Sequence, residues 1–311
     1  MKILGVGESV IDNVYIIKND KKNDSQSITD SKSQHIGGPV LSALILLSRF
    51  NLDCTFLTSI GKDHEGELIK RKLKEEKVKL VKHLQHKTKI NSIIIDPKNG
   101  QRRKFRGSVK HSFINNISIQ FIRQFDFIII DRHERKVFYE IIRKKKSSAK
   151  IVIDPSTEVS NFTLDMMKYA DFPILPIESL LHIAKNKGLN KCLKITYKIC
   201  AKPFIVTIGE LGSMVYDGIK PQLIPAIDIK AIDTTGAGDV YRGAFVYGIT
   251  QGWNLYECAR YSNAVAALEC TRLGNITAIP TKKEVHSFLN SSMQKKLVSM
   301  SNINSYFLSL G

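Results

Sequence analysis

Short apolar runs rich in β-branched residues alternate with helical stretches along most of this chain, and this alternation restricts the fold more than any other feature. The strand candidates are residues 3–6, 55–59, 127–130, 151–153 and 204–207. The helical stretches include residues 41–49, 65–76, 137–145 and 238–248. Continuous apolar runs of this length are typical of strands buried on both faces of a parallel sheet. We therefore predict an α/β fold, with a doubly wound, mostly parallel sheet flanked by helices and ligands bound beyond the carboxyl ends of its strands.

One region interrupts the alternation. A polar segment at 18–33 separates two halves of a potential hairpin, 13–17 and 34–36. Two more extended segments, 89–96 and 101–105, flank the turn residues Pro97-Lys98-Asn99-Gly100. We expect these pieces to form a small antiparallel β lid, with segments at about 13–36 and 88–108. The alternative is a sheet that decorates an edge of the molecule and covers no ligand.

The composition is ordinary for a globular protein, apart from a positive net charge. The 311 residues suit one α/β domain with a small accessory element. The net charge is +18, from 47 Lys and Arg against 29 Asp and Glu. A nucleic-acid partner is possible at such a charge but is not favoured, because the basic residues are dispersed. Attraction of anionic nucleotides explains the charge equally well.

Neither a membrane nor a disulfide framework is expected. No apolar run reaches the roughly 18 residues that a membrane span needs. The first residues resemble a buried strand and its turn rather than a signal peptide, so we expect a cytoplasmic protein. The five cysteines are an odd number with no short spacing, which argues against disulfides and a zinc site and predicts free thiols.

The segment 233–239 reads Asp-Thr-Thr-Gly-Ala-Gly-Asp and precedes a predicted helix. Gly236, Ala237 and Gly238 carry almost no side chain, so their backbone N–H groups can approach an anion at the positive end of the helix dipole. Asp239 stands at the same helix start. It could accept a proton from a hydroxyl beside this anion hole, or it could simply cap the helix. The spacing alone does not decide between these two roles.

This segment resembles the nucleotide-end motif of the ribokinase, or PfkB, family of sugar kinases. Three other segments resemble family motifs and occur in the family's order. They are the di-glycine Gly37-Gly38, the Gly-x-Asp-x-x-Gly pattern at 61–66 and the Thr-x-Gly-x-x-Gly pattern at 207–212. The resemblance covers roughly residues 1–285. It implies a ribokinase-like kinase domain over 1–290, a C-terminal tail over 291–311 and ATP-dependent phosphorylation of a sugar hydroxyl.

The resemblance also implies roles for individual residues. Asp239 would be the general base, with Gly236, Ala237 and Gly238 as the anion hole. The residues expected at the sugar are Asp12, Gly37, Gly38 and Ser42. The residues expected at the nucleotide are Thr207, Gly209, Gly212, Thr235 and Asn263. ATP with Mg²⁺ is implied. A potassium ion is a further expectation, held near Asp233, Thr235, Gly274 and Ala278.

The sequence departs from the family pattern at two places. The family usually has an Asn that contacts the sugar four residues after the second glycine, and this chain has Ser42. The hydroxyl has a shorter reach, so the identity of the sugar stays open. The family's Asn-x-x-Glu motif is replaced by Ile177-Glu178-Ser179-Leu180, in which only Glu178 could act, and then indirectly. Segments at 131–133 and 270–274 resemble the ketohexokinase-like branch, which favours a ketose acceptor.

Two further side chains are candidates for substrate contact. His133 follows a strand at the end where substrates bind, although a lone histidine is more often structural. Arg106 could reach an anionic substrate from the lid, or it could belong to a solvated basic face. A sugar kinase is the leading hypothesis. A nucleoside kinase and a catalytically weak regulatory homologue are the alternatives. Family members often form homodimers through their lids, so a homodimer is possible here, although the sequence does not fix the oligomeric state.

Overall fold

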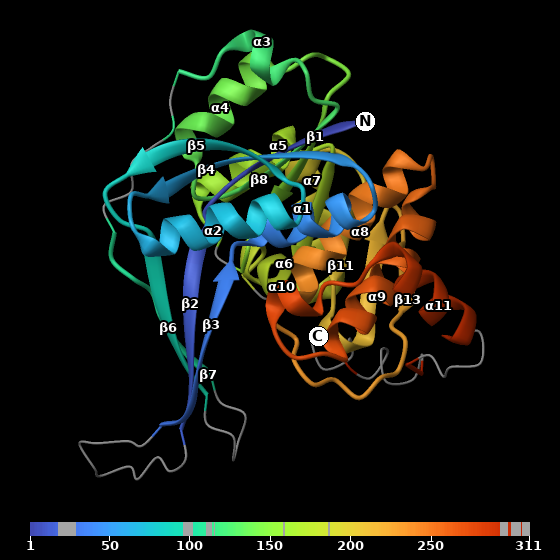
Figure 1. The fold of residues 1–311 in the computed structure, drawn as a ribbon. Coiled ribbons are helices and arrows are strands. Elements are labelled where there is room, and N and C mark those ends of the chain that lie inside the picture. The colour runs from blue at the N-terminus through green and yellow to red at the C-terminus, as the bar shows by residue number, and fades with distance from the viewer. Residues whose placement is uncertain are drawn as a thin grey trace.

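A nine-stranded sheet runs through the centre of the molecule (Figure 1). The computed structural model describes residues 1–17, 29–95, 102–109, 114, 116–157, 159–185, 187–292, 298–299 and 306. In order across the sheet, the strands are β13 (Pro221–Pro225), β12 (Gly212–Tyr216), β11 (Phe204–Thr207), β10 (Phe172–Pro176), β9 (Lys150–Asp154), β8 (Phe127–Asp131), β1 (Lys2–Val6), β4 (Asp53–Gly61) and β5 (Lys79–Gln85). Pairing is parallel from β5 to β11, while β12 and β13 are antiparallel. The predicted doubly wound α/β fold is confirmed.

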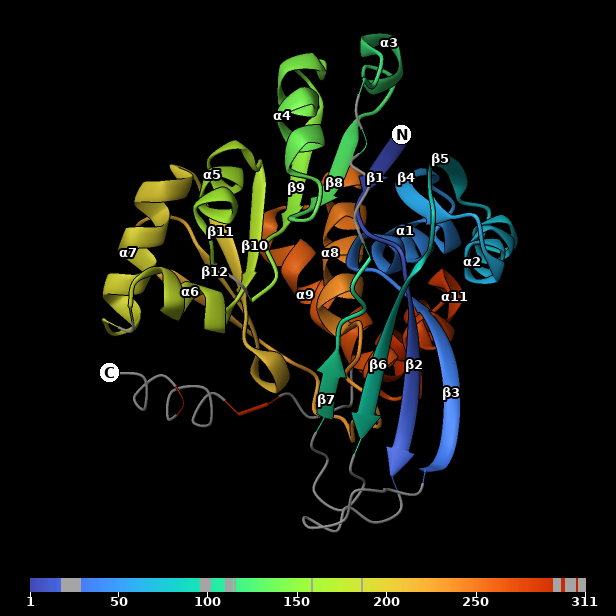
Figure 2. The ribbon, with the colours of Figure 1, turned by 90° about the vertical axis from the view of Figure 1, so that its left-hand side faces the viewer.

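Helices cover both faces of this sheet, as Figure 2 shows. One layer contains α1 (Pro39–Arg49), α2 (His64–Glu75), α8 (Ala237–Thr250), α9 (Leu255–Cys270) and α11 (Lys282–Ser292). The other layer contains α3 (Ile119–Ile122), α4 (Arg135–Lys144), α5 (Asn161–Tyr169), α6 (Ile177–Ile183) and α7 (Leu189–Cys200). Alternate residues of β8 divide between the two cores: Phe127 and Ile129 join the first, Ile128 and Ile130 the second. The central strands, such as β1 and β8, are largely apolar because both of their faces are buried, whereas the edge strand β5 carries exposed charged residues.

The segments expected to form a lid make a separate four-stranded sheet, called the lid below, that extends away from the main sheet (Figure 2). Its order is β3 (Thr29–Gly37), β2 (Val10–Ile17), β6 (Lys89–Ile95) and β7 (Arg102–Phe105). β3 and β7 are each antiparallel to their neighbours, and the central pair β2 and β6 is parallel. The predicted hairpin is confirmed by the register of Asn13 opposite Gln34. The turn at 97–100 and most of the polar segment at 18–33 lie outside the described residues.

The lid begins where the main sheet ends. β2 follows β1 after a short connection, and β6 follows β5 in the same way, so the lid rises from the carboxyl ends of two parallel strands. The Gly-x-Asp-x-x-Gly segment fixes one of these junctions. Asp63 accepts a hydrogen bond from Gly66 N (2.9 Å) as the N-cap of α2. It also accepts bonds from the backbone N and the hydroxyl of Thr88, both at 2.6 Å. This motif therefore ties the main sheet to the first residues of the lid.

Three other predictions concern the chain as a whole. All five cysteines are buried and free, as expected. Among the described residues, no helix combines the length and the hydrophobicity that crossing a membrane requires. α11 ends at Ser292, and the C-terminal tail predicted over 291–311 lies mostly outside the described residues.

Candidate functional site

The segment 233–239 forms the turn that leads into α8, and Asp233 anchors it. One carboxylate oxygen of Asp233 accepts the N–H of Thr235 (2.9 Å), and the other accepts the N–H of Gly274 (3.0 Å). The turn is thereby joined to the loop before α10 (Asn275–Ala278). This contact brings together three of the four residues expected around a monovalent cation. The fourth, Ala278, is fully buried in α10.

Gly236 and Gly238 have different structural roles in this turn. Gly236 is the N-cap of α8 with a φ of 98°, a left-handed conformation that favours glycine. A Cβ on Gly236 would also lie 2.5 Å from Asn275 Oδ1. A Cβ on Gly238 would meet no atom within 4 Å. The fold therefore requires a glycine at 236, whereas the space beside Gly238 is open to a ligand.

The Asp239 carboxylate faces a cavity instead of capping α8. The helix has no side-chain cap, and Asp239 Oδ1 accepts a bond from Arg242 Nη1 at 3.0 Å. Arg242 Nη2 pairs in turn with Asp154 Oδ1 at 2.7 Å. Burial raises the pKa of Asp239 to about 7; the charge of Arg242 opposes this rise and that of Asp154 adds to it. A carboxylate with a pKa near neutrality can both accept and release a proton at physiological pH.

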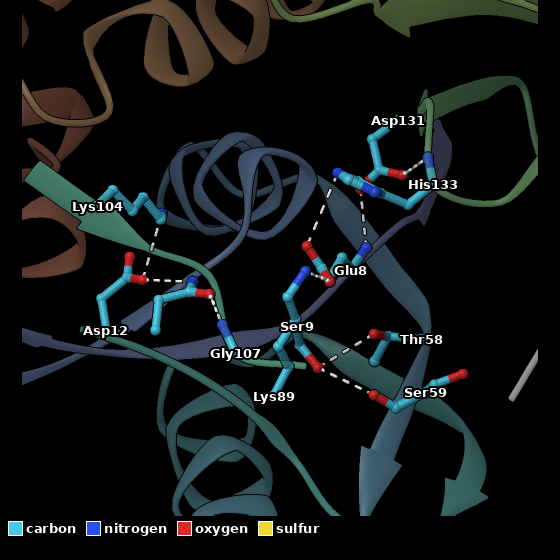
Figure 3. A network of polar contacts seen from close by, with 11 residues as sticks. Glu8, Ser9, Asp12, Thr58, Ser59, Lys89, Lys104, Gly107, Asp131 and His133 are labelled. Carbon is cyan, nitrogen blue, oxygen red and sulfur yellow. Dashed lines mark hydrogen bonds and ion pairs between the residues drawn. The ribbon is translucent and has the colours of Figure 1, made fainter. Parts of the chain in front are cut away.

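The cavity in front of Asp239 has a volume of about 200 Å³ and is lined by the main sheet, the lid and the start of α8. We call it the acceptor cavity. Asp12, from β2, receives a bond from Asn91 Nδ2 of β6 (2.7 Å) and lies 3.3 Å from Lys104 Nζ of β7 (Figure 3). Asn91 Oδ1 accepts the N–H of Gly107 at 3.2 Å. Strands β2, β6 and β7 of the lid thus meet at Asp12.

A second group of polar residues lines the same cavity at the end of β8 (Figure 3). Asp131 accepts the backbone N–H groups of Glu8 (2.8 Å) and His133 (2.9 Å). Glu8 pairs with Lys89 at 2.5 Å, and its other oxygen lies 3.7 Å from His133 Nε2. Burial raises the pKa of Asp131 to about 8. His133 and Arg106 both line this cavity, so the structure brings both candidate substrate contacts to it.

Ser42 does not line the acceptor cavity, although it was expected at the sugar. The side chain is fully buried, and its hydroxyl lies 3.3 Å from Gly38 O and 3.0 Å from Asn275 Oδ1. Asn275 lines the cavity in its place, next to Gly236. Of the two glycines, Gly38 lines the cavity, whereas Gly37 packs against the carboxylate of Asp12. Ser42 therefore supports the side-chain amide of Asn275, which comes from a distant part of the chain.

A larger cavity, of about 550 Å³, lies on the other side of the α8 N-terminus. We call it the nucleotide cavity, because the residues expected at the nucleotide gather there: Thr207, Gly209, Gly212 and Asn263. Asn263 donates to Ile224 O (2.9 Å) and so fixes β13 at the cavity wall. Thr235, also expected at the nucleotide, lines the acceptor cavity instead, whereas Thr234 lines the nucleotide cavity. The apolar walls, which include Ile227 and Ile229, suit a flat aromatic base.

The N-terminal turn of α8 contributes to both cavities. Gly236 and Asp239 line the acceptor cavity, whereas Ala237 and Gly238 line the nucleotide cavity. A group transferred from one cavity to the other would pass this helix end. Within the described residues, no cluster of three or more His, Cys, Asp or Glu side chains is arranged to hold a metal ion. Glu178 is exposed on α6 and lines neither cavity.

Sequence reasoning missed several residues of the site. Arg242 and Asp154 support Asp239, Asn91 and Lys104 support Asp12, and Asn275 replaces Ser42 at the cavity wall. Arg242 had a detectable signal, because residue i+3 on a helix lies beside residue i. The other contacts join residues far apart in the sequence, and no local pattern indicates them.

Comparisons with known proteins agree with this architecture. A family model described as pfkB family carbohydrate kinase matches residues 2–282. A ribokinase from Lactococcus lactis is 32% identical over 145 residues, which make up 47% of this chain and 47% of that protein. The bifunctional protein HldE from a Nitratiruptor species is 23% identical over 93% of this chain and 65% of its own length. This chain thus spans about half to two thirds of these two relatives.

Solved structures show the same fold. The ribokinase from Thermotoga maritima has a TM-score of 0.81 at 22% identity, covering 93% of this chain and 99% of that chain. The nucleoside kinase from Methanocaldococcus jannaschii has a TM-score of 0.78 at 21% identity, covering 93% and 98%. At these identities the likeness shows the fold alone. The family model, however, matches nearly the whole described body, and this chain therefore belongs to the pfkB family of carbohydrate kinases.

Proposed function

We propose that this protein phosphorylates a hydroxyl group of a sugar with ATP, and that Asp239 is the general base. One observation carries the proposal. Asp239 stands at the helix end that separates a large, mostly apolar cavity from a smaller one lined by many charged side chains, and burial raises the pKa of Asp239 to about 7. ATP occupies the larger cavity, and the sugar occupies the smaller one.

Each group of residues has a separate role in the proposed reaction. Asp239 accepts the hydroxyl proton as the sugar oxygen bonds to the γ-phosphorus and the bond to the ADP oxygen breaks. The backbone N–H groups of Gly236, Ala237 and Gly238 stabilise the charge on the phosphoryl group in transit. Ala237 N makes only a long contact with Thr234 O (3.4 Å), so its N–H can turn to a phosphate oxygen at little cost. Asp12 and Asn91 hold the sugar hydroxyls.

Two cations belong to the proposal. Mg²⁺ would neutralise the ATP phosphates and would be held chiefly by phosphate oxygens and water. The Asp233–Gly274 contact places two loops beside the anion hole, where backbone carbonyls could hold a potassium ion. Activity in potassium, compared with tetramethylammonium, tests this second ion.

The shape of the acceptor cavity favours a sugar over a nucleoside. The cavity is about 200 Å³, and its lining is dominated by charged and amide side chains. A nucleoside would also need an apolar surface for its base, and the apolar walls lie in the nucleotide cavity. A coupled ADP-release assay over sugars and nucleosides tests the proposal. Sugar-dependent ADP release supports it. Preference for nucleosides would favour the alternative kinase, and nucleotide binding without turnover would favour a regulatory protein.

We predict that kcat/KM depends on pH through Asp239. The carboxylate must be deprotonated to act as a base, so kcat/KM should rise with pH and level off above about pH 7. Arg242 lowers the pKa of Asp239, so Arg242→Gln should move the midpoint to higher pH. Arg242→Lys keeps the positive charge and is the matched control. Identical pH profiles for wild type and Arg242→Gln would refute this role for Asp239.

We also predict that Asn275 positions the acceptor and that Ser42 positions Asn275. Asn275→Ala should raise the KM for the sugar about tenfold, and Ser42→Ala should raise it about two- to fivefold, the range for single hydrogen bonds. The KM for ATP should not change. Because the two side chains act as one unit, the double variant should resemble Asn275→Ala alone. Multiplicative effects in the double variant would show that the two residues act independently.

A further inference from the structure

One wall of the nucleotide cavity comes from the last part of the chain. Val298 lines this cavity together with residues of β11, β12, α8 and α9. It lies beyond the match to the family model, which ends at residue 282. Its backbone N–H donates to the carbonyl oxygen of Ala226 at 3.0 Å. A residue from the predicted C-terminal tail is therefore a component of this cavity.

Ala226, the hydrogen-bond partner of Val298, is itself held in place. The N–H of Ala226 donates to Leu211 O at 3.2 Å, and both of these residues line the nucleotide cavity. Shortly before Ala226, the carbonyl oxygen of Ile224 accepts a bond from Asn263 Nδ2 of α9 at 2.9 Å. Val298 is therefore bonded to a part of the cavity wall that other hydrogen bonds already fix.

Tyr306 provides a second contact between this part of the chain and the body of the protein. It is half-buried and packs against the hydrophobic core on the face of the main sheet that α3 to α7 cover. Burial raises the pKa of the Tyr306 hydroxyl, and the charge of Glu178 on α6 raises this pKa further. Tyr306 therefore lies near α6.

The contacts of Val298 and Tyr306 lie on two sides of the nucleotide cavity. Val298 is bonded just beyond β13, the edge strand, whereas α6 directly follows β10, which lies further into the sheet. Between β13 and β10 are β12 and β11, and Gly212 of β12 and Thr207 of β11 line the cavity. The two contacts therefore flank the strand ends at which the nucleotide cavity opens.

Val298 adds to the apolar part of the nucleotide cavity. The other apolar side chains in its lining include Ile227, Ile229, Ala266 and Ala267. On the proposed function, the charged phosphates of ATP lie at the start of α8, and the base is the part of the nucleotide with a large apolar face. Apolar walls of a ligand cavity bind such faces. An apolar residue in this wall therefore suits contact with the base.

We propose that Val298 contacts the base of ATP and contributes to nucleotide affinity, and that Tyr306 is a positioning residue that holds Val298 at the cavity. The nucleotide site is then completed by a part of the chain that lies outside the matched family domain. This inference rests on the proposed function only for the binding of ATP in the nucleotide cavity. It does not depend on the identity of the acceptor or on the role of Asp239.

Two substitutions at Val298 test the contact by calorimetric titration of ATP with Mg²⁺. Alanine keeps the backbone N–H and removes two methyl groups, so Val298→Ala should raise the dissociation constant for ATP about three- to tenfold. Val298→Ile keeps a branched apolar side chain and should stay within about twofold of wild type. Ile219→Ala is the control, because Ile219 is 86% exposed and does not line the cavity. An unchanged dissociation constant in Val298→Ala, or an equal loss in Ile219→Ala, would overturn the inference.

The positioning role of Tyr306 is tested by its effect on Val298. Tyr306→Ala removes the ring that packs against the core, so it should also raise the dissociation constant for ATP. Tyr306→Phe keeps the ring and should lose less affinity. If Tyr306 acts through Val298, the double alanine variant should bind ATP as the weaker of the two single variants does. Multiplicative effects in the double variant would contradict the positioning role.

The binding measurement also separates this inference from the kinase function. If wild type binds ATP without turning over any acceptor, and Val298→Ala weakens that binding, the inference stands although the kinase function has failed. If wild type is an active kinase and Val298→Ala binds ATP as tightly as wild type, the inference alone is overturned. A wild type that binds no ATP would overturn both.

Discussion

Asp239→Asn should lower kcat by about 10²- to 10⁴-fold, the usual contribution of a positioned general base. Asparagine has nearly the same size, and its amide oxygen can still accept the bond from Arg242 that Asp239 Oδ1 accepts at 3.0 Å. The turn and both cavities should therefore keep their shape. The amide has no lone pair basic enough to take the hydroxyl proton, so only the chemical step should fail. Steady-state ADP release with saturating ATP and acceptor measures the loss.

The controls for Asp239→Asn separate chemistry from binding. The dissociation constant for ATP, measured by calorimetry, should stay close to that of wild type. Asp53→Asn removes a carboxylate at the start of β4, where Asp53 pairs with Lys79 at 2.8 Å at the opposite end of the sheet. It should leave kcat unchanged. A loss below about tenfold in Asp239→Asn would rule out Asp239 as the base.

Gly238→Val should lower kcat/KM for ATP by about 10²- to 10³-fold without unfolding the protein. A Cβ at this position meets no atom within 4 Å, and valine is no worse a helix former than glycine. The valine side chain should instead fill the space in which, on the proposed function, a phosphate approaches the backbone. The predicted loss matches that for removal of one anion-hole donor. ADP release and thermal unfolding, measured on the same preparation, give the two quantities.

Gly236→Ala is the contrasting variant. Its Cβ would lie 2.5 Å from Asn275 Oδ1, and its φ of 98° is unfavourable for alanine. We expect a lower melting temperature for Gly236→Ala and an unchanged one for Gly238→Val. If Gly238→Val has wild-type kinetics, the anion hole is assigned to the wrong backbone groups. If Gly238→Val is as unstable as Gly236→Ala, the inference that the space beside Gly238 is open is wrong.

The main elements of the fold could be read from the sequence because burial on both faces leaves a continuous apolar run. Phe127–Asp131 is such a strand, and its residues divide between two hydrophobic cores. The edge strand Lys79–Gln85 escaped prediction because its charged residues are exposed and it resembles a loop. The hairpin of Gly212–Tyr216 and Pro221–Pro225 escaped because glycine and proline at the strand ends suggest turns.

Those parts of the site that lie within one segment could also be predicted from the sequence. Contacts between distant segments could not. The turn before α8 places a carboxylate and small residues in one helical turn, so the geometry of this turn could be predicted from its sequence. Ser42 seemed a shortened substrate contact, yet its partner Asn275 lies 233 residues away. The contact of Lys104 with Asp12 likewise depends on how β7 and β2 lie across β6. Such contacts follow from tertiary structure alone.

The central claim is that a phosphoryl group passes from ATP, across the end of α8, to an acceptor hydroxyl. The most direct measurement is mass spectrometry of the acceptor after incubation with ATP labelled with ¹⁸O in its γ-phosphate, using wild type and Asp239→Asn. We predict a phosphorylated acceptor that carries the label and forms with wild type far faster than with the variant. Labelled inorganic phosphate with an unmodified acceptor, or equal product from both proteins, would contradict this claim.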